Sequence, residues 1–201
     1  MSGFHIIEEA TNKQYQELIK QEIKRAQWTF VDDLTTPEST IYKQKNFGFG
    51  HNIFQNNMVL SPLFSLCYPL VLGVANDLGL NVTSVLHAKT MLQTPDTDAS
   101  LHNNPHVDWY QDHAVILYYV NDADGDTFLF NETTNDYPSR EISSAGTFSI
   151  KERITPKQGK AIYFDGRNFH ASSRPTKGVR IILNFDVIVE PINQTGSKND
   201  R

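Results

Sequence analysis

Apolar residues near the start of the chain recur at helical spacing. They stand three or four positions apart through residues 12–27, which predicts an amphipathic helix there. The stripe consists of Tyr15, Leu18, Ile19, Ile23 and Ala26. Thr11 followed by Gln14 matches the capping-box pattern and predicts where this helix begins.

A second helix is predicted to begin after Ser61. Ser61 followed by Pro62 is typical of an N-cap and a first helical turn, and Gly79 ends the pattern. The apolar residues that return every fourth position are Leu66, Leu70, Val74 and Leu78. Pro69 lies inside this segment and predicts a kink, because proline has no amide hydrogen for the helix interior.

From Val82 onward the pattern changes to short β-branched and aromatic runs separated by Asn, Asp, Gly and Pro. The runs are residues 82–92, 113–120, 127–132, 146–150, 160–164 and 179–187. Many short strands at such spacing indicate a sandwich or a barrel. The layout is therefore helices first and a β-rich half second.

No linker interrupts this layout, so we expect one domain over residues 1–192 and a polar tail at 193–201. Helical support is expected mainly over residues 1–80, and a β-rich core over about 82–190. Residues 29–60 look irregular. Within them, the glycines and aromatics of 46–54 fit a substrate lid and locally packed aromatics equally well.

Composition narrows the class of protein. The 201 residues are 39% hydrophobic, as in a globular chain with a sizeable core. A formal charge of −5 offers no broad attraction for phosphate backbones, so we expect no nucleic acid partner. No signal-like or membrane-spanning run is evident, so we expect a cytoplasmic protein without membrane contact. The single cysteine, Cys67, is expected to fill the core.

Three residues have the types and spacing of a metal site. His106 and Asp108 stand two residues apart, so in an extended segment both side chains point to the same side while Val107 points away. His170, after the turn that follows residues 161–164, supplies a third candidate ligand. Two imidazoles and one carboxylate suit iron(II), because they leave coordination positions free.

The last predicted strand places a cation on the same side as these ligands. Alternation puts Arg180, Ile182, Asn184 and Asp186 on one face, and Ile181, Leu183, Phe185 and Val187 on the other. A buried guanidinium needs a partner, and a carboxylate ligand could bind it in bidentate fashion. Tyr119 could add a hydroxyl donor.

Several residues compete for these roles. His102 and His113 lack a carboxylate two residues on and are expected to be surface or supporting residues. Arg174 is a rival for Arg180, but it lies next to Pro175 in a predicted loop, where we expect it to be exposed to solvent and to have no strand to aim it. The acidic run 121–126 resembles a calcium loop out of register, so we interpret it as a solvated turn.

Over residues 84–188 the chain resembles the prolyl-4-hydroxylase-like branch of the iron(II)- and 2-oxoglutarate-dependent oxygenases. The resemblance rests on His106-x-Asp108, the strand Ile116–Val120, the turn Gly125-Asp126-Thr127 and Phe164-Asp165-Gly166-x-x-x-His170 followed by Arg180. Two features depart from the family: Asp124-Gly125 replaces a double glycine, and a tyrosine on the strand before the first ligand is not evident. A small phage or bacterial member would fit this length.

The resemblance implies an α+β chain with a cupin-like double-stranded β-helix, or jelly roll, and supporting N-terminal helices. It implies that His106, Asp108 and His170 bind iron(II), that Arg180 binds the distal carboxylate of 2-oxoglutarate, and that Tyr119 helps while Tyr118 faces away. Dioxygen is the other cosubstrate, and ascorbate is a candidate reductant. The carboxylate of Asp108 implies hydroxylation rather than halogenation.

Hydroxylation of a prolyl residue in a peptide or protein is the activity nearest to the resemblance. The same chemistry on a small molecule or free amino acid is the alternative. A non-catalytic jelly-roll module that binds a metal is a rival from another class. The oligomeric state stays open.

Overall fold

The computed structural model describes residues 3–34, 46–96, 101–109, 111–136 and 148–192, and the predicted tail at 193–201 lies outside them. The helices are α1 (Lys13–Lys24) and α2 (Leu63–Asp77). The strands are β1 (His5–Ile7), β2 (Thr29–Val31), β3 (Gly48–Gln55), β4 (Met58–Val59), β5 (Leu80–Gln93), β6 (Ala114–Tyr119), β7 (Thr127–Thr133), β8 (Ile150–Ile154), β9 (Ala161–Asp165), β10 (Asn168–Ser172) and β11 (Arg180–Pro191).

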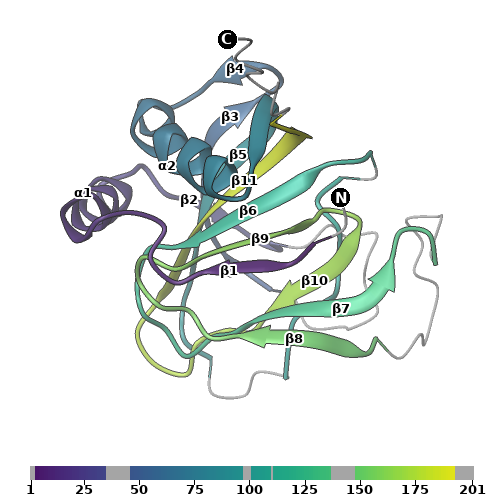
Figure 1. Cartoon of the computed structure of the whole chain (residues 1–201). Helices are drawn as coiled ribbons and strands as arrows, with labels where there is room; N and C mark the ends of the chain where they lie inside the picture. Colours follow the sequence, from purple (N-terminus) through teal and green to yellow (C-terminus); the bar gives the residue numbers. More distant parts are fainter. Residues whose placement is uncertain (1–2, 35–45, 97–100, 110, 137–147, 193–201) are drawn as a thin grey trace, which may run out of the picture.

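These strands form two sheets (Figure 1). The larger has eight strands in the order β1-β9-β6-β11-β5-β3-β2, with β4 paired to β3, and the smaller has the order β10-β7-β8. The strand neighbours in the described sheets pair antiparallel. The long strands β5 and β11 lie side by side near the middle of the larger sheet.

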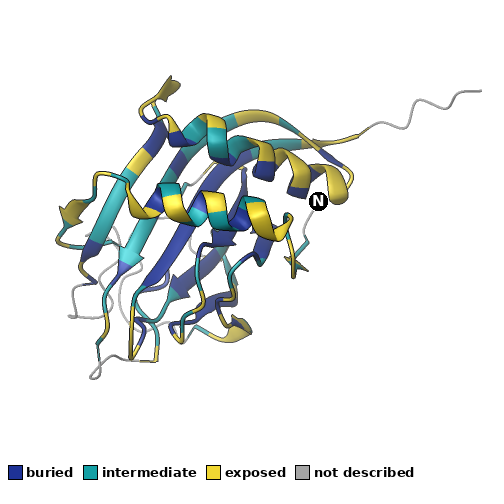
Figure 2. Ribbon diagram, turned by 90° about the vertical axis from the view of Figure 1, so that its left-hand side faces the viewer, coloured by how far each residue is buried: buried dark blue, intermediate teal, exposed yellow. Residues whose placement is uncertain are grey.

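Both helices lie across one face of the larger sheet (Figure 2). The side chain of Asn12 accepts a hydrogen bond from the backbone amide of Tyr15 and so caps α1. The N-cap is therefore one residue later than the predicted Thr11. The predicted second helix is confirmed, and Pro69 lies inside it. Among the described residues, neither helix has both the length and the apolar character needed to cross a bilayer.

Three apolar clusters fill the molecule. The largest lies between the helices and the larger sheet and includes Ile19, Cys67 and Phe185, each 0% exposed. A second lies on the opposite face of the larger sheet and includes Ile182 and Leu129. A third packs on the outer face of the smaller sheet. The alternation predicted for the last strand is therefore confirmed, as is the burial of Cys67.

The interpretation of residues 29–60 as irregular is wrong, because three strands lie in the described parts of this segment, 29–34 and 46–60. Residues 48–55 form β3, which pairs with β2 on one side and β5 on the other. The lid hypothesis for 46–54 therefore does not hold for this strand, whose backbone hydrogen bonds belong to the sheet. The strands β1 and β10 were not predicted either. Each is short, and β10 follows a tight turn directly after β9.

Candidate metal centre and adjoining pocket

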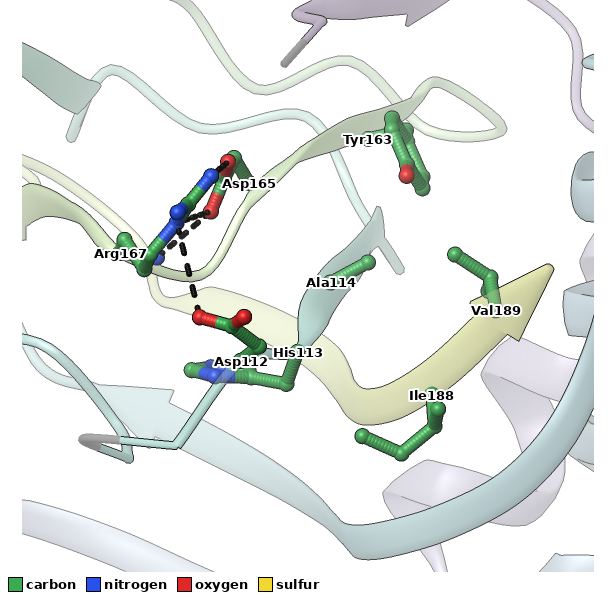
Figure 3. Close-up of a pocket in the computed structure, with 8 residues that line it drawn as sticks. All are labelled: Asp112, His113, Ala114, Tyr163, Asp165, Arg167, Ile188 and Val189. Carbon is green, nitrogen blue, oxygen red and sulfur yellow. Dashed lines mark hydrogen bonds and ion pairs between the residues drawn. The ribbon is translucent and has the colours of Figure 1, made fainter. Parts of the chain in front are cut away.

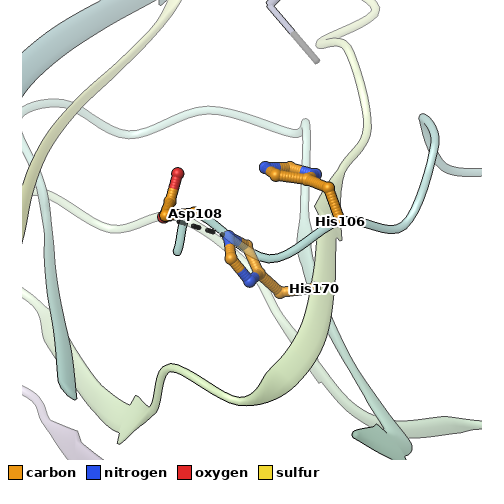
Figure 4. Close-up of side chains that lie close together, drawn as sticks. All are labelled: His106, Asp108 and His170. Carbon is orange, nitrogen blue, oxygen red and sulfur yellow. Dashed lines mark ion pairs between the residues drawn. The ribbon is translucent and has the colours of Figure 1, made fainter. Parts of the chain in front are cut away.

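His106 and His170 are held side by side by the backbone (Figure 4). The amide of each residue donates to the carbonyl oxygen of the other, at 2.9 Å in both directions. This antiparallel bridge joins the segment before β6 to β10. The bridge holds the two ring centroids 4.5 Å apart, so two histidines that are far apart in the sequence lie next to each other.

Asp108 completes the cluster. Val107 turns its side chain into the third apolar cluster, as alternation predicted, so Asp108 returns to the side of His106. One candidate ligand atom from each of the three residues lies within 4.8 Å of the others, in the one such cluster found among the described residues. The Oδ2 atom of Asp108 is 3.5 Å from Nε2 of His170.

Backbone carbonyls orient both imidazoles. Nδ1 of His106 lies 3.1 Å from the carbonyl oxygen of Asn104, and Nδ1 of His170 lies 3.4 Å from that of Asn168. A ring whose Nδ1–H donates to a carbonyl leaves Nε2 as a lone-pair donor. Such contacts are typical of histidines that bind metals through Nε2.

The protonation states also suit a metal. Burial, with a contribution from His170, lowers the pKa of His106 to about 4, so this ring is neutral at physiological pH. Burial alone would raise the pKa of Asp108, but Lys89 and the two histidines hold it well below its usual range. A neutral imidazole and an ionised carboxylate are the forms that bind metals.

A pocket between the two sheets joins the three residues to Arg180. Its walls include all three candidate ligands together with Lys89, Thr127 and Arg180. Arg180 is the first residue of β11 and is only 3% exposed. The side chain reaches this pocket because alternation aims it away from the helices, as the sequence predicted.

The hydrogen bonds described for the Arg180 guanidinium go to uncharged oxygen atoms. Nε donates to the carbonyl of Gly125 at 2.9 Å, and the two terminal nitrogens donate to Gln93 at 3.0 Å and to Thr127 at 2.7 Å. A Cβ at position 125 would lie 2.6 Å from the carbonyl oxygen of Ser173, so glycine is required there. The positive charge of Arg180 thus has ordered neighbours but no anionic hydrogen-bond partner among them.

The two tyrosines of β6 face opposite ways, as predicted. Tyr118 lies in the cluster under the helices, and Tyr119 lies in the cluster on the other face. The Tyr119 ring centroid is 5.9 Å from the guanidinium carbon of Arg180. Its hydroxyl is buried and makes no hydrogen bond of normal geometry within the described part of the chain. Burial raises the pKa of Tyr119 to about 12, so it stays a donor.

A ladder of cross-strand pairs that sequence reasoning missed lies beside the candidate ligands. The pairs along β11 and β5 are Arg180 with Gln93, Ile182 with Met91, Asn184 with Lys89, and Asp186 with His87. The signal was available, because alternation within residues 82–92 puts His87, Lys89 and Met91 on one face.

Two members of the ladder contact Asp108. Nζ of Lys89 lies 3.1 Å from Oδ1 of Asp108, and Nδ2 of Asn184 lies 3.5 Å from Oδ2. Asp186 is 0% exposed and accepts hydrogen bonds from Asn184 and from the indole of Trp109. Burial, together with Asp108, raises the pKa of Asp186. A buried polar network of Lys89, Asn184 and Asp186 therefore adjoins Asp108, the candidate metal ligand.

The other two histidines named from the sequence lie elsewhere. The ring of His102 packs against Phe128 and Phe130, with centroid distances of 5.4 and 5.0 Å. His113 lines a second pocket with Asp112 and Arg167 (Figure 3). None of the residues that line this second pocket also lines the pocket beside Arg180.

The expectation that Arg174 is an exposed loop residue is wrong. It is 6% exposed, and its guanidinium carbon sits 4.1 Å from the ring centroid of Phe47. Nε and one terminal nitrogen donate to the carbonyl and hydroxyl oxygens of Thr94, at 3.2 and 2.7 Å. A second terminal nitrogen reaches Asp96 at 3.4 Å. Through these contacts Arg174 links the segment after β10 to the end of β5. It does not line the pocket beside Arg180.

The acidic run 121–126 is a turn whose carboxylates are engaged by the chain itself. Asp122 accepts a hydrogen bond from the backbone amide of Gln158 at 2.7 Å, and Asp124 accepts one from the backbone amide of Thr176 at 2.9 Å. Asp126 pairs with Arg153. This agrees with the interpretation as a turn between strands rather than a calcium loop.

No family model matches the sequence, and no curated protein sequence matches it. Solved structures do match the fold. SnoN, a non-haem α-ketoglutarate-dependent epimerase from nogalamycin biosynthesis, has a TM-score of 0.62 at 12% identity, covering 100% of this chain and 89% of its own. An oxidoreductase of the 2OG-Fe(II) oxygenase family from Burkholderia pseudomallei has a TM-score of 0.64 at 10% identity. The match covers 92% of this chain and 84% of the Burkholderia chain.

A prolyl-4-hydroxylase from Pseudomonas putida also matches, with a TM-score of 0.55 at 12% identity, covering 93% of this chain and 92% of its own. At such low identity these likenesses establish the fold. The predicted double-stranded β-helix with supporting helices is thereby confirmed.

Proposed function

We propose that this protein is an iron(II)- and 2-oxoglutarate-dependent oxygenase that hydroxylates an unactivated C–H bond. The observation that carries the proposal is the convergence of His106, Asp108 and His170 on a pocket that also holds a buried arginine. Three protein ligands leave positions open on a six-coordinate metal, whereas a structural zinc site with four would leave none. The names of the matching structures support the same class.

In this proposal His106 and His170 hold iron(II) through Nε2, and Asp108 holds it through a carboxylate oxygen. The fit is favourable because both Nδ1 atoms face backbone carbonyls and the carboxylate is ionised. When bound, iron(II) would supply the redox chemistry that couples oxidative decarboxylation of 2-oxoglutarate to oxygen insertion into a C–H bond. The protein side chains position the reactants, and ascorbate would serve as an external reductant.

Arg180 would bind the distal carboxylate of 2-oxoglutarate. Its guanidinium is buried among uncharged hydrogen-bond acceptors, so a carboxylate in the pocket would neutralise it. The hydroxyl of Thr127 and the ring of Tyr119 lie near this cation, and the two hydroxyl groups would act as further donors. These contacts would exclude water from the inner end of the cosubstrate and fix its orientation.

For the substrate we propose a prolyl residue in a peptide or protein, in keeping with the prolyl-4-hydroxylase match. A small molecule is the second candidate. A small-molecule substrate is favoured by the higher TM-score and full coverage of the match to the epimerase from nogalamycin biosynthesis. The two candidates share all the residues assigned above and differ only in what occupies the open end of the pocket.

The test is succinate formation from 2-oxoglutarate by the full chain loaded with iron(II), in air, with proline-containing peptides and with small-molecule candidates. Oxygenase activity gives succinate and a product heavier by one oxygen atom. His106→Ala and His170→Ala should give neither product while melting as the wild type does. A chain that binds metal and 2-oxoglutarate but forms no succinate would instead be the non-catalytic jelly-roll module.

A further inference from the structure

Lys89 places an ammonium group beside the candidate iron ligand. It projects from the inner face of β5, opposite Asn184 of β11, and it lines the same pocket as the three ligands. Its Nζ lies 3.1 Å from Oδ1 of Asp108. A cation at this place repels a metal cation, so its presence calls for an explanation other than metal affinity.

The two oxygen atoms of Asp108 have different surroundings. Oδ1 faces Lys89, whereas Oδ2 faces Nε2 of His170 at 3.5 Å and the amide of Asn184 at 3.5 Å. The oxygen on the side of the histidines is therefore the one that a shared metal would meet. The other oxygen is held away by an ion pair that is largely buried, since the Lys89 and Asp108 side chains are 20% and 8% exposed.

We infer that Lys89 is a positioning residue that restricts Asp108 to one metal-binding oxygen and so keeps a coordination position free for the cosubstrate. This inference rests on the proposed function. A carboxylate can bind a metal through one or both oxygens, and binding through both would occupy a position that the bidentate 2-oxoglutarate needs. Lys89 blocks the second mode by holding Oδ1.

A second carboxylate favours the charged form of the lysine. Asp186 lies on the same face of β11 and is fixed by Asn184, Trp109 and His87. Burial opposes the charge of Lys89, but Asp108 and Asp186 outweigh it and raise the pKa of Lys89. Lys89 therefore keeps its positive charge beside Asp108.

Removal of the ammonium has two opposite consequences. Lys89→Met keeps the length of the side chain but removes a positive charge near the metal and frees Oδ1, so the metal should bind more tightly. The same change lets Asp108 occupy an extra position and takes a cation away from the pocket, so 2-oxoglutarate should bind more weakly. A lysine that served only to stabilise the fold would weaken both together.

The experiment uses the full-length apo protein and cobalt(II), whose absorption spectrum reports its coordination. Cobalt(II) is titrated first, and 2-oxoglutarate is then titrated into the cobalt-loaded protein without oxygen. The variants are Lys89→Met, Lys89→Arg, which keeps a cation, and Lys24→Met, which removes an exposed lysine from α1. Circular dichroism melting confirms that each variant is folded.

For Lys89→Met we expect the cobalt dissociation constant to fall and that of 2-oxoglutarate to rise, each by roughly tenfold or more, with a changed cobalt spectrum. Lys89→Arg should retain the wild-type spectrum, and Lys24→Met should match the wild type throughout. Parallel weakening of both ligands in Lys89→Met, or no change in either, would overturn the inference. A wild-type chain that binds neither cobalt nor 2-oxoglutarate would instead overturn the proposed function.

Discussion

Replacement of Arg180 by methionine tests the cosubstrate site most directly. Arg180 is 3% exposed, so a carboxylate bound to it would be removed from water along with the guanidinium. Loss of one partner of a buried ion pair costs about 3–5 kcal/mol. Since about 1.4 kcal/mol corresponds to a factor of ten, the 2-oxoglutarate dissociation constant should rise by about two to four orders of magnitude.

The assay is calorimetric titration of 2-oxoglutarate into the metal-loaded protein, with metal affinity measured separately. Metal binding should survive in Arg180→Met, because the guanidinium hydrogen bonds go to Gly125, Gln93 and Thr127 and not to the candidate ligands. Arg25→Met is the matched control, since its side chain is 72% exposed and pairs with Glu22 on the surface of α1. A surface pair contributes about 1 kcal/mol or less.

Arg180→Lys refines the measurement, because lysine keeps the charge and loses the planar fork. The 2-oxoglutarate dissociation constant of Arg180→Lys should lie between those of the wild type and of Arg180→Met. The reasoning fails if Arg180→Met binds 2-oxoglutarate within about threefold of the wild type, a difference well below the cost of breaking a buried pair. It also fails if Arg25→Met causes the larger loss.

Three further predictions follow from other sites. His106→Ala should retain no metal after dialysis, as measured by elemental analysis, while its melting temperature without metal stays near that of the wild type. Arg174→Met should lower the free energy of unfolding by about 1–3 kcal/mol in urea titrations, because it removes the hydrogen bonds to Thr94 and the ion pair with Asp96. Burial raises the pKa of Cys67 to about 12, so the reactive thiolate is suppressed near pH 8. Cys67 should therefore react with Ellman's reagent only after the protein is unfolded, and rapid reaction of the native chain would contradict its burial.

The sequence predicted best where one periodicity governed a whole segment. Alternation along the last strand gave the correct inner face for Arg180 and the correct outer face for Phe185. The spacing of His106 and Asp108 likewise placed both side chains on one side. In each case the local backbone alone decides where the side chain points, so no long-range information was needed.

The sequence failed where pairing over long distances decided the structure. Residues 48–55 contain two glycines and an asparagine and carry no strong strand signal, yet β5 and β2 pair with them on both sides. Arg174 looked exposed because its neighbours are loop residues, and only the fold brings Thr94 and Phe47 to its guanidinium. The contact between Lys89 and Asp108 depends in the same way on how β5 lies beside the candidate ligands.

The paired backbone hydrogen bonds between His106 and His170 affect how an ion would be captured and released. Main-chain contacts hold the two imidazoles together, so the chain does not have to order itself when an ion arrives. Many small metal sites, in contrast, form only as their ligands fold around the ion. Here the affinity depends on the exchange of hydration water for protein ligands and on the nearby charges. After the ion dissociates, the two imidazoles would stay in place as a preformed binding site for another ion.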